Sequence, residues 1–240
     1  MEELRQKGVD KSCPLCRKPL PPGPEKLFDL GYGICMKIKG AIDRSRPGVD
    51  DTTPWPALST EQQGEMDQAV AMIREAADQG HMGAQAYCGD LYGFGRGVAK
   101  DDRLSFVYIE KAAQQGGREA QFNTGIYYQD GLGCDQSDER AAECFQKASF
   151  RGLACAQDLL GRAYQFGQGV PQSDEKAFEL FSQSAAQGES DGQINLGRYY
   201  YEGVRCKQSY ERAVELWRQS AAQGEMVAQY NLAVSQIRLM

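Results

Sequence analysis

Two cysteines near the start of the chain are the clearest candidates for metal chemistry. Cys13 and Cys16 are three positions apart, a spacing at which two thiolates can hold one side of a tetrahedral zinc ion. Zinc needs two further ligands, but no Cys or His precedes Cys13, and neither Cys35 nor His81 has ligand spacing. The pair therefore predicts a zinc half-site, with zinc as a cofactor only if the missing ligands are supplied. A redox role would require a βαβ context, which the sequence does not indicate.

No other pattern predicts catalysis. The glycine-rich stretch 93–97 lacks the spacing of a phosphate-binding loop. His81 is the single histidine, so a multi-histidine metal site is excluded, and we interpret it as a loop residue. No nucleophile elbow, zinc-protease helix or pair of catalytic carboxylates occurs. We therefore predict a non-enzymatic protein that needs no cofactor of its own.

A second group of polar residues has the donors needed to bind a carboxylate. Asn123, Asn195 and Asn231 are separated by multiples of 36 residues, and Arg162 and Arg198 keep the same step three positions further on. Residues three apart on a helix lie on the same face. Because Arg and Asn present several donors, we predict a partner-binding patch for an acidic end or side chain of a peptide. The alternative is structural, with the Asn side chains bonded to the backbone of a neighbouring helix.

The 36-residue step runs through most of the chain. Sixteen of the 27 glycines fall into four columns at this step, and columns of Gln and Tyr accompany them. The columns are Gly80, Gly116, Gly152, Gly188 and Gly224; Gly89, Gly125, Gly161 and Gly197; Gly95, Gly131, Gly167 and Gly203; and Gly97, Gly133 and Gly169. A fixed period of this length indicates a repeat architecture.

Each period predicts two helices. Between 156 and 188, apolar residues recur at helical spacing, a Gly-x-Gly turn interrupts them, and Ser173 is a suitable N-cap for a second helix. Gly188 stands where a helix can end in a left-handed residue, and Gly161 inside the first helix predicts a close crossing by the second. The predicted fold is all-α, a right-handed α-solenoid of stacked antiparallel helix pairs with a 36-residue period.

Domain limits follow from this period. We predict a zinc-finger-like segment at 1–23, a helix and a proline-rich linker at 24–59, and the repeat stack at 60–240. The stack is predicted to contain a capping helix at 60–79 from an incomplete repeat, repeats at 81–116, 117–152, 153–188 and 189–224, and a partial repeat at 225–240. Gly31, Gly33 and Gly40 weaken the apolar stripe of the helix expected over 24–44.

The repeat residues carry a family resemblance. Residues 192–203, Gly-Gln-Ile-Asn-Leu-Gly-Arg-Tyr-Tyr-Tyr-Glu-Gly, resemble the first helix of a Sel-one-like repeat, and Lys-Ala-Ala-Gln-Gln-Gly at 111–116 resembles the second. The resemblance covers 61–240 and implies an α-solenoid related to tetratricopeptide repeats. It also implies an adaptor that binds a protein or peptide on its concave face, with some members in protein quality control. Thr124 and Arg205 depart from the pattern, and we expect local adjustment there.

The cysteine pair carries a second resemblance. Residues 13–20, Cys-Pro-Leu-Cys-Arg-Lys-Pro-Leu, resemble the last zinc-ligand pair of a RING finger. An alternative function therefore stays open, a fragment of a RING-type E3 ubiquitin ligase whose repeats recruit substrate. A third interpretation, a secreted disulfide-linked repeat protein, requires two cysteines in each repeat. The other cysteines lack that spacing, and we interpret them as small buried apolar groups.

Composition limits the partners and the compartment. The formal net charge of −6 argues against a nucleic-acid partner, which needs clustered Lys and Arg. No apolar run of ~18 residues predicts a membrane span. The first residues do not form a signal peptide, so we predict reduced cysteines in the cytoplasm or nucleus. Val234, Ile237 and Leu239 would be uncovered in the last helix, which predicts end-to-end self-association or a missing continuation.

Overall fold

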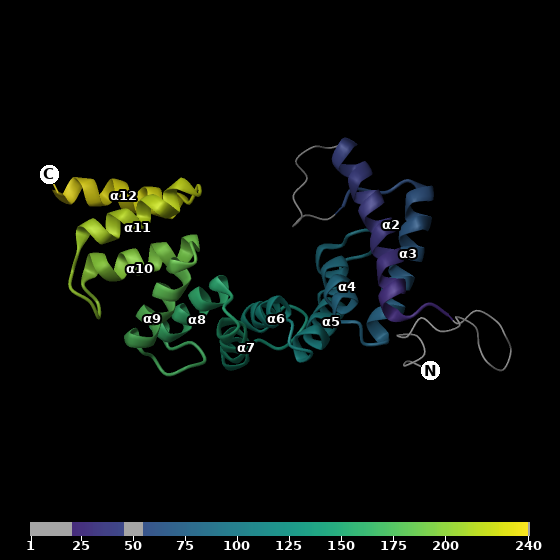
Figure 1. Cartoon of the computed structure of the whole chain (residues 1–240), viewed down its shortest axis with the longest axis horizontal. Helices are drawn as coiled ribbons and strands as arrows, with labels where there is room; N and C mark the ends of the chain where they lie inside the picture. The colour runs from purple at the N-terminus through teal and green to yellow at the C-terminus, as the bar shows by residue number, and fades with distance from the viewer. Residues whose placement is uncertain (1–20, 46–54, 240) are drawn as a thin grey trace, which may run out of the picture. The chain divides into compact units, whose positions relative to one another are not determined.

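The computed structural model describes residues 21–45 and 55–239, and these residues form helices and no strand (Figure 1). The helices are α2 (Pro24–Ser45), α3 (Thr60–Asp78), α4 (Met82–Phe94), α5 (Asp102–Gln114), α6 (Arg118–Asp130), α7 (Asp138–Phe150), α8 (Ala154–Phe166), α9 (Asp174–Ala186), α10 (Ser190–Glu202), α11 (Tyr210–Ala222) and α12 (Met226–Leu239). The all-α prediction is confirmed.

The chain divides into two compact units, Met1–Gln115 and Gly116–Met240. In unit 1, α2 packs against α3, and α4 against α5. In unit 2, the pairs are α6 with α7, α8 with α9, and α10 with α11, and α12 packs on α11. Each pair also contacts the pair that follows it within its unit, so the predicted stack of antiparallel helix pairs is confirmed.

Local sequence signals set where the helices begin and end. Ser137, Ser173 and Ser209 are N-caps, and each side chain accepts a hydrogen bond from a backbone N–H in the first turn. The first helices of the pairs end at glycines in the left-handed region, with φ between 65° and 73°. These residues are Gly95, Gly131, Gly167 and Gly203. The glycines at the helix ends therefore act as stop signals, as predicted.

Glycines inside the first helices allow the second helices to cross closely. A Cβ added at Gly161 would lie 2.7 Å from Cε1 of Phe181, and one at Gly197 would lie 2.5 Å from Nε1 of Trp217. A Cβ added at Gly89 would be equally close to Ile109, and one added at Gly125 equally close to Phe145. Large side chains on the second helix therefore pack directly onto the backbone of the first, which explains the glycine column.

The helix pair α2–α3 is built on the same plan as the repeats. A Cβ at Gly31 would lie 2.6 Å from Cγ1 of Ile73 and 2.8 Å from the backbone oxygen of Ala69. Gly31 is therefore needed in α2, because α3 crosses the helix at this position too closely for a side chain. The segment 60–79, predicted as the second helix of an incomplete repeat, has its first helix in α2, which the sequence-based domain limits had placed outside the stack.

Candidate partner-binding site

The predicted binding residues all lie on first helices of unit 2. Asn123 is on α6, Arg162 on α8, Asn195 and Arg198 on α10, and Asn231 on α12. Asn195 and Arg198 are joined by a hydrogen bond of 3.4 Å from Nη2 to Oδ1. Arg198 Nη2 also donates to Oε1 of Gln165 on α8, at 2.8 Å. The structure therefore brings α8 and α10 together through part of the predicted patch.

Asn195 has a side-chain partner that was not predicted. Its Nδ2 donates to Oδ1 of Asp158 on α8 at 2.7 Å. The structural alternative expected a bond to helix backbone, whereas the observed acceptor is a carboxylate of the preceding repeat. No hydrogen bond of the Asn123 or Asn231 side chain occurs within residues 21–45 and 55–239, so the Asn column has no common contact.

Asp158 is a functional candidate that sequence reasoning missed. Its side chain is buried, with 2% of the residue exposed. Burial raises the pKa of Asp158 from 3.8 to about 6, and Asp191 and Glu189 add to this effect. The hydrogen bond from Asn195 and the charge of Arg162 act in the opposite direction on the pKa. The sequence did contain a sign of this residue: Asp158 is charged, whereas the equivalent residues of the neighbouring repeats, Phe122 and Ile194, are apolar.

The two arginines differ in their surroundings. Arg162 is exposed, and its guanidinium makes no hydrogen bond or ion pair with any residue that the structure describes. Arg198 is half-buried and is oriented by Gln165 and Asn195. Both guanidiniums therefore keep donors for a ligand, and those of Arg198 are oriented by Gln165 and Asn195.

The Gln columns connect consecutive repeats. Nε2 of Gln223 donates to the backbone oxygen of Gly188 at 3.0 Å and to Oε1 of Gln193 at 3.2 Å. Gln115 bonds Gly80 and Gln85 in the same way. The Gln that follows α5 and the Gln that follows α11 thus each bond the turn of the preceding repeat and the first helix of their own repeat. The column that contains Gln85 and Gln193 was found in the sequence, but its bonds to Gln115 and Gln223 were not predicted.

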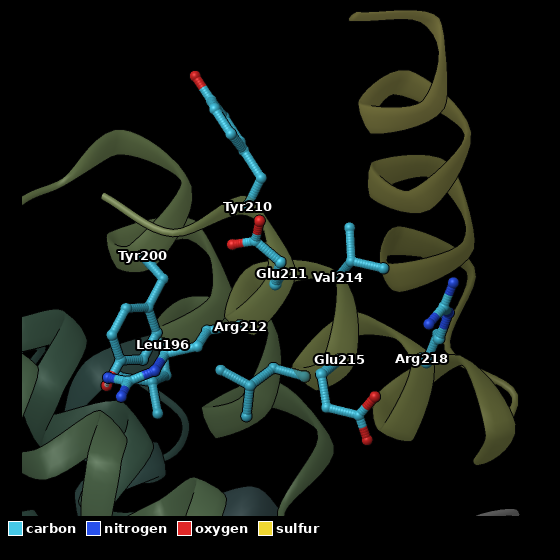
Figure 2. Close-up of a pocket in the computed structure, with 9 residues that line it drawn as sticks. Leu196, Tyr200, Tyr210, Glu211, Arg212, Val214, Glu215 and Arg218 are labelled. Atoms are coloured by element: carbon cyan, nitrogen blue, oxygen red, sulfur yellow. Dashed lines mark hydrogen bonds between the residues drawn. The ribbon is translucent and has the colours of Figure 1, made fainter. Parts of the chain in front are cut away.

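A second surface lies between α10 and α11 (Figure 2). A pocket of about 800 Å³ there is lined by apolar and charged side chains of both helices, including Leu196, Leu216, Tyr200, Arg212, Glu215 and Arg218. The Arg212 guanidinium lies over the Tyr200 ring, 5.2 Å from its centroid. Equivalent pairs occur one and two repeats earlier, Lys176 over Tyr164 and Arg140 over Tyr128. The pocket thus contains a cation–aromatic contact that each repeat of unit 2 reproduces.

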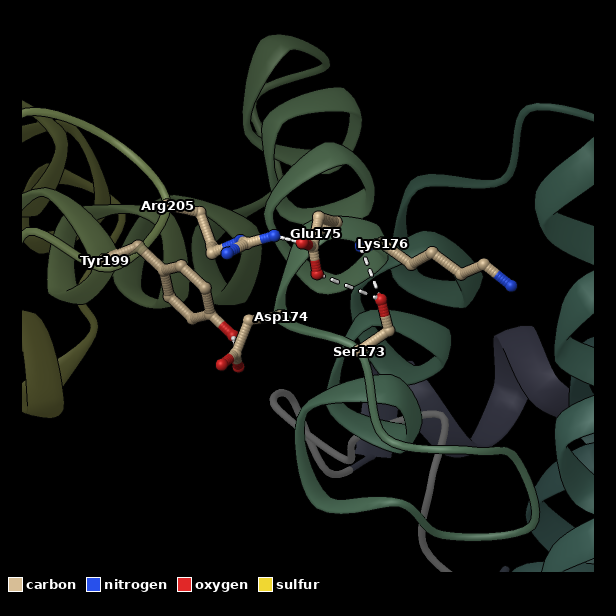
Figure 3. Close-up of polar contacts among 6 residues, drawn as sticks. All are labelled: Ser173, Asp174, Glu175, Lys176, Tyr199 and Arg205. Atoms are coloured by element: carbon tan, nitrogen blue, oxygen red, sulfur yellow. Dashed lines mark hydrogen bonds and ion pairs between the residues drawn. The ribbon is translucent and has the colours of Figure 1, made fainter.

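Contacts at the start of α9 fix it to the following repeat (Figure 3). Arg205 forms an ion pair with Glu175, and the Tyr199 hydroxyl donates to Oδ1 of Asp174 at 3.1 Å. Arg205 has φ 57°, although it is not glycine. Thus Arg205, which departs from the repeat pattern, keeps the left-handed turn of the glycine that it replaces, as the expected local adjustment requires.

Metal and thiol chemistry finds no support in the part of the chain that the structure describes. Cys13 and Cys16 lie outside those residues, so the zinc half-site and the ligase alternative stay predictions. Within 21–45 and 55–239 no group of three or more His, Cys, Asp or Glu side chains could hold a metal ion. Burial raises the pKa of Cys35 to about 11 and of Cys88 to about 12. These two thiols therefore stay protonated and pack as apolar groups.

No helix among the residues described is both long and apolar enough to cross a lipid bilayer.

Stacked helix pairs, crossing glycines and a polar first-helix face define a helical-repeat protein of the solenoid class. The pattern described as Sel1 repeat matches residues 63–81, 83–117, 118–152, 156–189 and 190–225. The chain belongs to this family, and the Sel-one-like resemblance is confirmed. Sel1 repeat proteins generally mediate protein–protein interactions, and their scaffold is typically non-enzymatic.

Similar structures and a curated relative support this assignment. The chain is 31% identical to c5321, a protective antigen of uropathogenic Escherichia coli strains, with a TM-score of 0.69 over 88% of this chain and 40% of that one. It is 28% identical to a Sel1 repeat protein from Oxalobacter formigenes, with a TM-score of 0.64 over 72% and 71%. An exopolysaccharide production negative regulator of Rhizobium meliloti (strain 1021) is 33% identical over 89 residues, 37% of this chain and 30% of that protein. The chain thus spans less than half the length of the antigen and of the regulator.

Proposed function

We propose that this chain is a non-enzymatic scaffold that binds an acidic segment of a partner protein on the first-helix face of unit 2. The observation that carries the proposal is the pair Arg162 and Arg198. These arginines occupy the same position in consecutive repeats and lie on α8 and α10. Neither forms an ion pair with a carboxylate among the residues described. Two such guanidiniums suit a carboxylate, which each can contact through two donors.

The local structure prepares one arginine for binding. Gln165 and Asn195 both accept from Nη2 of Arg198, so its other donors are held in a fixed direction. A donor that is already oriented loses less conformational entropy when the ligand binds. Asp158 is covered by Asn195 and buried, so its carboxylate does not occupy the exposed surface that an acidic ligand would use.

A peptide panel tests the proposal. Fluorescently labelled decapeptides with acidic C-terminal residues would be compared with the same peptides as C-terminal amides and as Asn/Gln analogues. We expect anisotropy to report tighter binding of the acidic forms, and hydrogen exchange to show protection in α8 and α10. Equal binding of the acidic and neutral forms would contradict the proposal. Protection confined to the pocket between α10 and α11 would place binding on the other surface and would also contradict it.

A further inference from the structure

A buried carboxyl is linked to both arginines of the proposed partner site. Asp158 precedes Arg162 by four residues on α8, and residues four apart share one face of a helix. Asn195 connects Asp158 to Arg198, because its Nδ2 donates to Asp158 Oδ1 at 2.7 Å and its Oδ1 accepts from Arg198 at 3.4 Å. Only 2% of Asp158 is exposed, so the side chain does not reach a ligand on the surface. Its effect on a ligand therefore passes through its charge and through Asn195.

The surroundings of Asp158 favour its neutral form. Its carboxylate forms no ion pair with any residue that the structure describes, and burial removes the water that would solvate the charge. Glu189 and Asp191, at the start of α10, add negative charge that also opposes ionisation. The Asn195 amide and Arg162 favour the ionised form. With burial as the largest effect, the pKa of Asp158 is raised to about 6, so the carboxyl changes its charge close to neutral pH.

A ligand carboxylate would change this balance of charges. Arg162 and Arg198 stay protonated near neutral pH, whereas an acidic segment bound to them adds a negative charge near Asp158. Because Asp158 is buried, salt screens its interactions only weakly. Ionised Asp158 therefore opposes the ligand, and neutral Asp158 does not. Since coupling between two binding events is reciprocal, the bound ligand must also raise the proton affinity of Asp158.

We propose that Asp158 is a positioning residue of the partner site, and that binding of an acidic segment is coupled to uptake of a proton by the Asp158 carboxyl. This inference rests on the proposed function, because it requires the ligand to lie on Arg162 and Arg198. A protonated carboxyl keeps an oxygen that accepts from Asn195, so Arg198 stays oriented and only the opposing charge is lost. The partner is therefore bound more tightly as the pH falls through about 6.

Calorimetry of the full chain with an acidic decapeptide measures the coupling. A ligand that raises the proton affinity of Asp158 about threefold gives a Kd about 2.5-fold higher at pH 8.0 than at pH 5.5. We expect a rise of at least about twofold. At pH 6.5, titrations in two buffers of different ionisation enthalpy should show uptake of about a quarter of a proton. The carboxyls of the peptide are ionised over this range. Burial raises the pKa of the Cys155 thiol, which also interacts with Asp158, above its ordinary value of 9.0, so this thiol stays neutral.

Two amide variants separate charge coupling from structural support. Asp158→Asn is permanently neutral and should bind the peptide at pH 8.0 about as tightly as the parent chain does at pH 5.5. Its Kd should not depend on pH, and no proton should be taken up. Asp191→Asn is the matched control, because it removes an exposed carboxylate of α10 instead, and it should keep both the pH dependence and the proton uptake. A purely structural role of Asp158 would produce no proton uptake in the parent chain.

The outcomes distinguish this inference from the function on which it rests. Peptide binding that is independent of pH in the parent chain, or equally pH-dependent in Asp158→Asn, would overturn the inference and leave the proposed function standing. No binding of the acidic peptide at any of the three pH values would overturn both. The coupling can also be measured without a ligand, since Arg162→Ala should raise the pKa of Asp158 further, as followed by carbon NMR of its carboxyl. An unchanged pKa would contradict the coupling between Arg162 and Asp158.

Discussion

Glycine has three separate roles within a single repeat, and each follows from the absence of a side chain. Gly161 allows Phe181 to approach the backbone of α8, and Gly167 ends that helix with φ 69°. Gly169 combines both requirements, because φ is 67° and an added Cβ would lie 2.1 Å from the backbone oxygen of Asp138. Positive φ costs an L-residue roughly 1–2 kcal/mol, and contact with backbone cannot be relieved by a rotamer change.

Two neighbouring glycines should therefore respond differently to the same substitution. We expect Gly167→Ala to lower the free energy of unfolding by about 1 kcal/mol, because its Cβ would make ordinary contacts, the nearest at 3.4 Å. Gly169→Ala should cost about 2 kcal/mol more, because it also pushes the turn away from α7. Urea denaturation of both variants measures the difference. Equal losses would show that the turn moves freely, contrary to the packing described.

Asp158 gives stability a specific pH dependence. Burial raises its pKa to about 6 in the folded chain, above its ordinary value of 3.8. The folded state therefore holds the proton more tightly than the unfolded state does. This contribution to stability is fully present below pH 4 and is lost as the pH rises through 6.

Asp158→Asn should thus raise the free energy of unfolding by about 2 kcal/mol at pH 8, since the amide oxygen can still accept from Asn195. The gain should shrink towards pH 4. Asp191→Asn, on the exposed surface of α10, is the control and should change stability much less. A gain for Asp158→Asn that is the same at pH 4 and pH 8 would contradict the raised pKa of Asp158.

Among the elements, α2 shows best what pattern reasoning can and cannot supply. Its existence and extent followed from the apolar stripe over 24–44, and the repeat helices followed from the 36-residue columns and the Ser caps. The pairing of α2 with α3 did not follow, because the connection 46–59 breaks the period and hides Gly31 from the glycine columns. Gly31 could be recognised as a crossing glycine only when Ile73 and Ala69 were placed beside it.

Alanine substitutions two residues apart test this assignment of α2. Gly31→Ala should destabilise the chain by about 2 kcal/mol, because the new Cβ would press on Ile73 and on the Ala69 backbone. Gly33 has nothing within 4 Å of an added Cβ, so Gly33→Ala should stabilise by about 0.5–1 kcal/mol. Thermal unfolding of both variants supplies the comparison. The same shift for both, in either direction, would argue against a close crossing of α2 and α3.

Only those residues of the candidate site that recur at the 36-residue step could be predicted from the sequence. Arg162, Arg198 and Asn195 were found because each recurs at a fixed step, and two of them are indeed in contact. Asp158 was not found, because it is a single departure from its column, and Gln165 was not found, because its column also contains Gly93 and Tyr201 and so shows no fixed residue type. Their role depends on which side chain of the next repeat lies opposite, and a one-dimensional period does not contain that information.

For the molecule as a whole, each unit is a stack of helix pairs, so side chains at equivalent positions meet along the stack. In unit 2 this brings Arg198 to Gln165 and Asn195 to Asp158, each across one repeat. The stack can thus present a row of oriented polar groups without a folding cost at binding. In the structure described, this row contains two arginines, Arg162 and Arg198, that form no ion pair.

Isothermal titration calorimetry tests most directly whether Arg162 and Arg198 bind the acidic partner. The ligand would be the acidic peptide of the panel that binds with the highest affinity. The chain would be compared with the double variant R162A/R198A and with R218A, which removes an exposed arginine from the pocket between α10 and α11. Loss of charge-assisted hydrogen bonds from both arginines should weaken binding at least ~tenfold, while R218A should stay within twofold. Unchanged affinity of the double variant, or an equal loss in R218A, would contradict a binding site on the first helices.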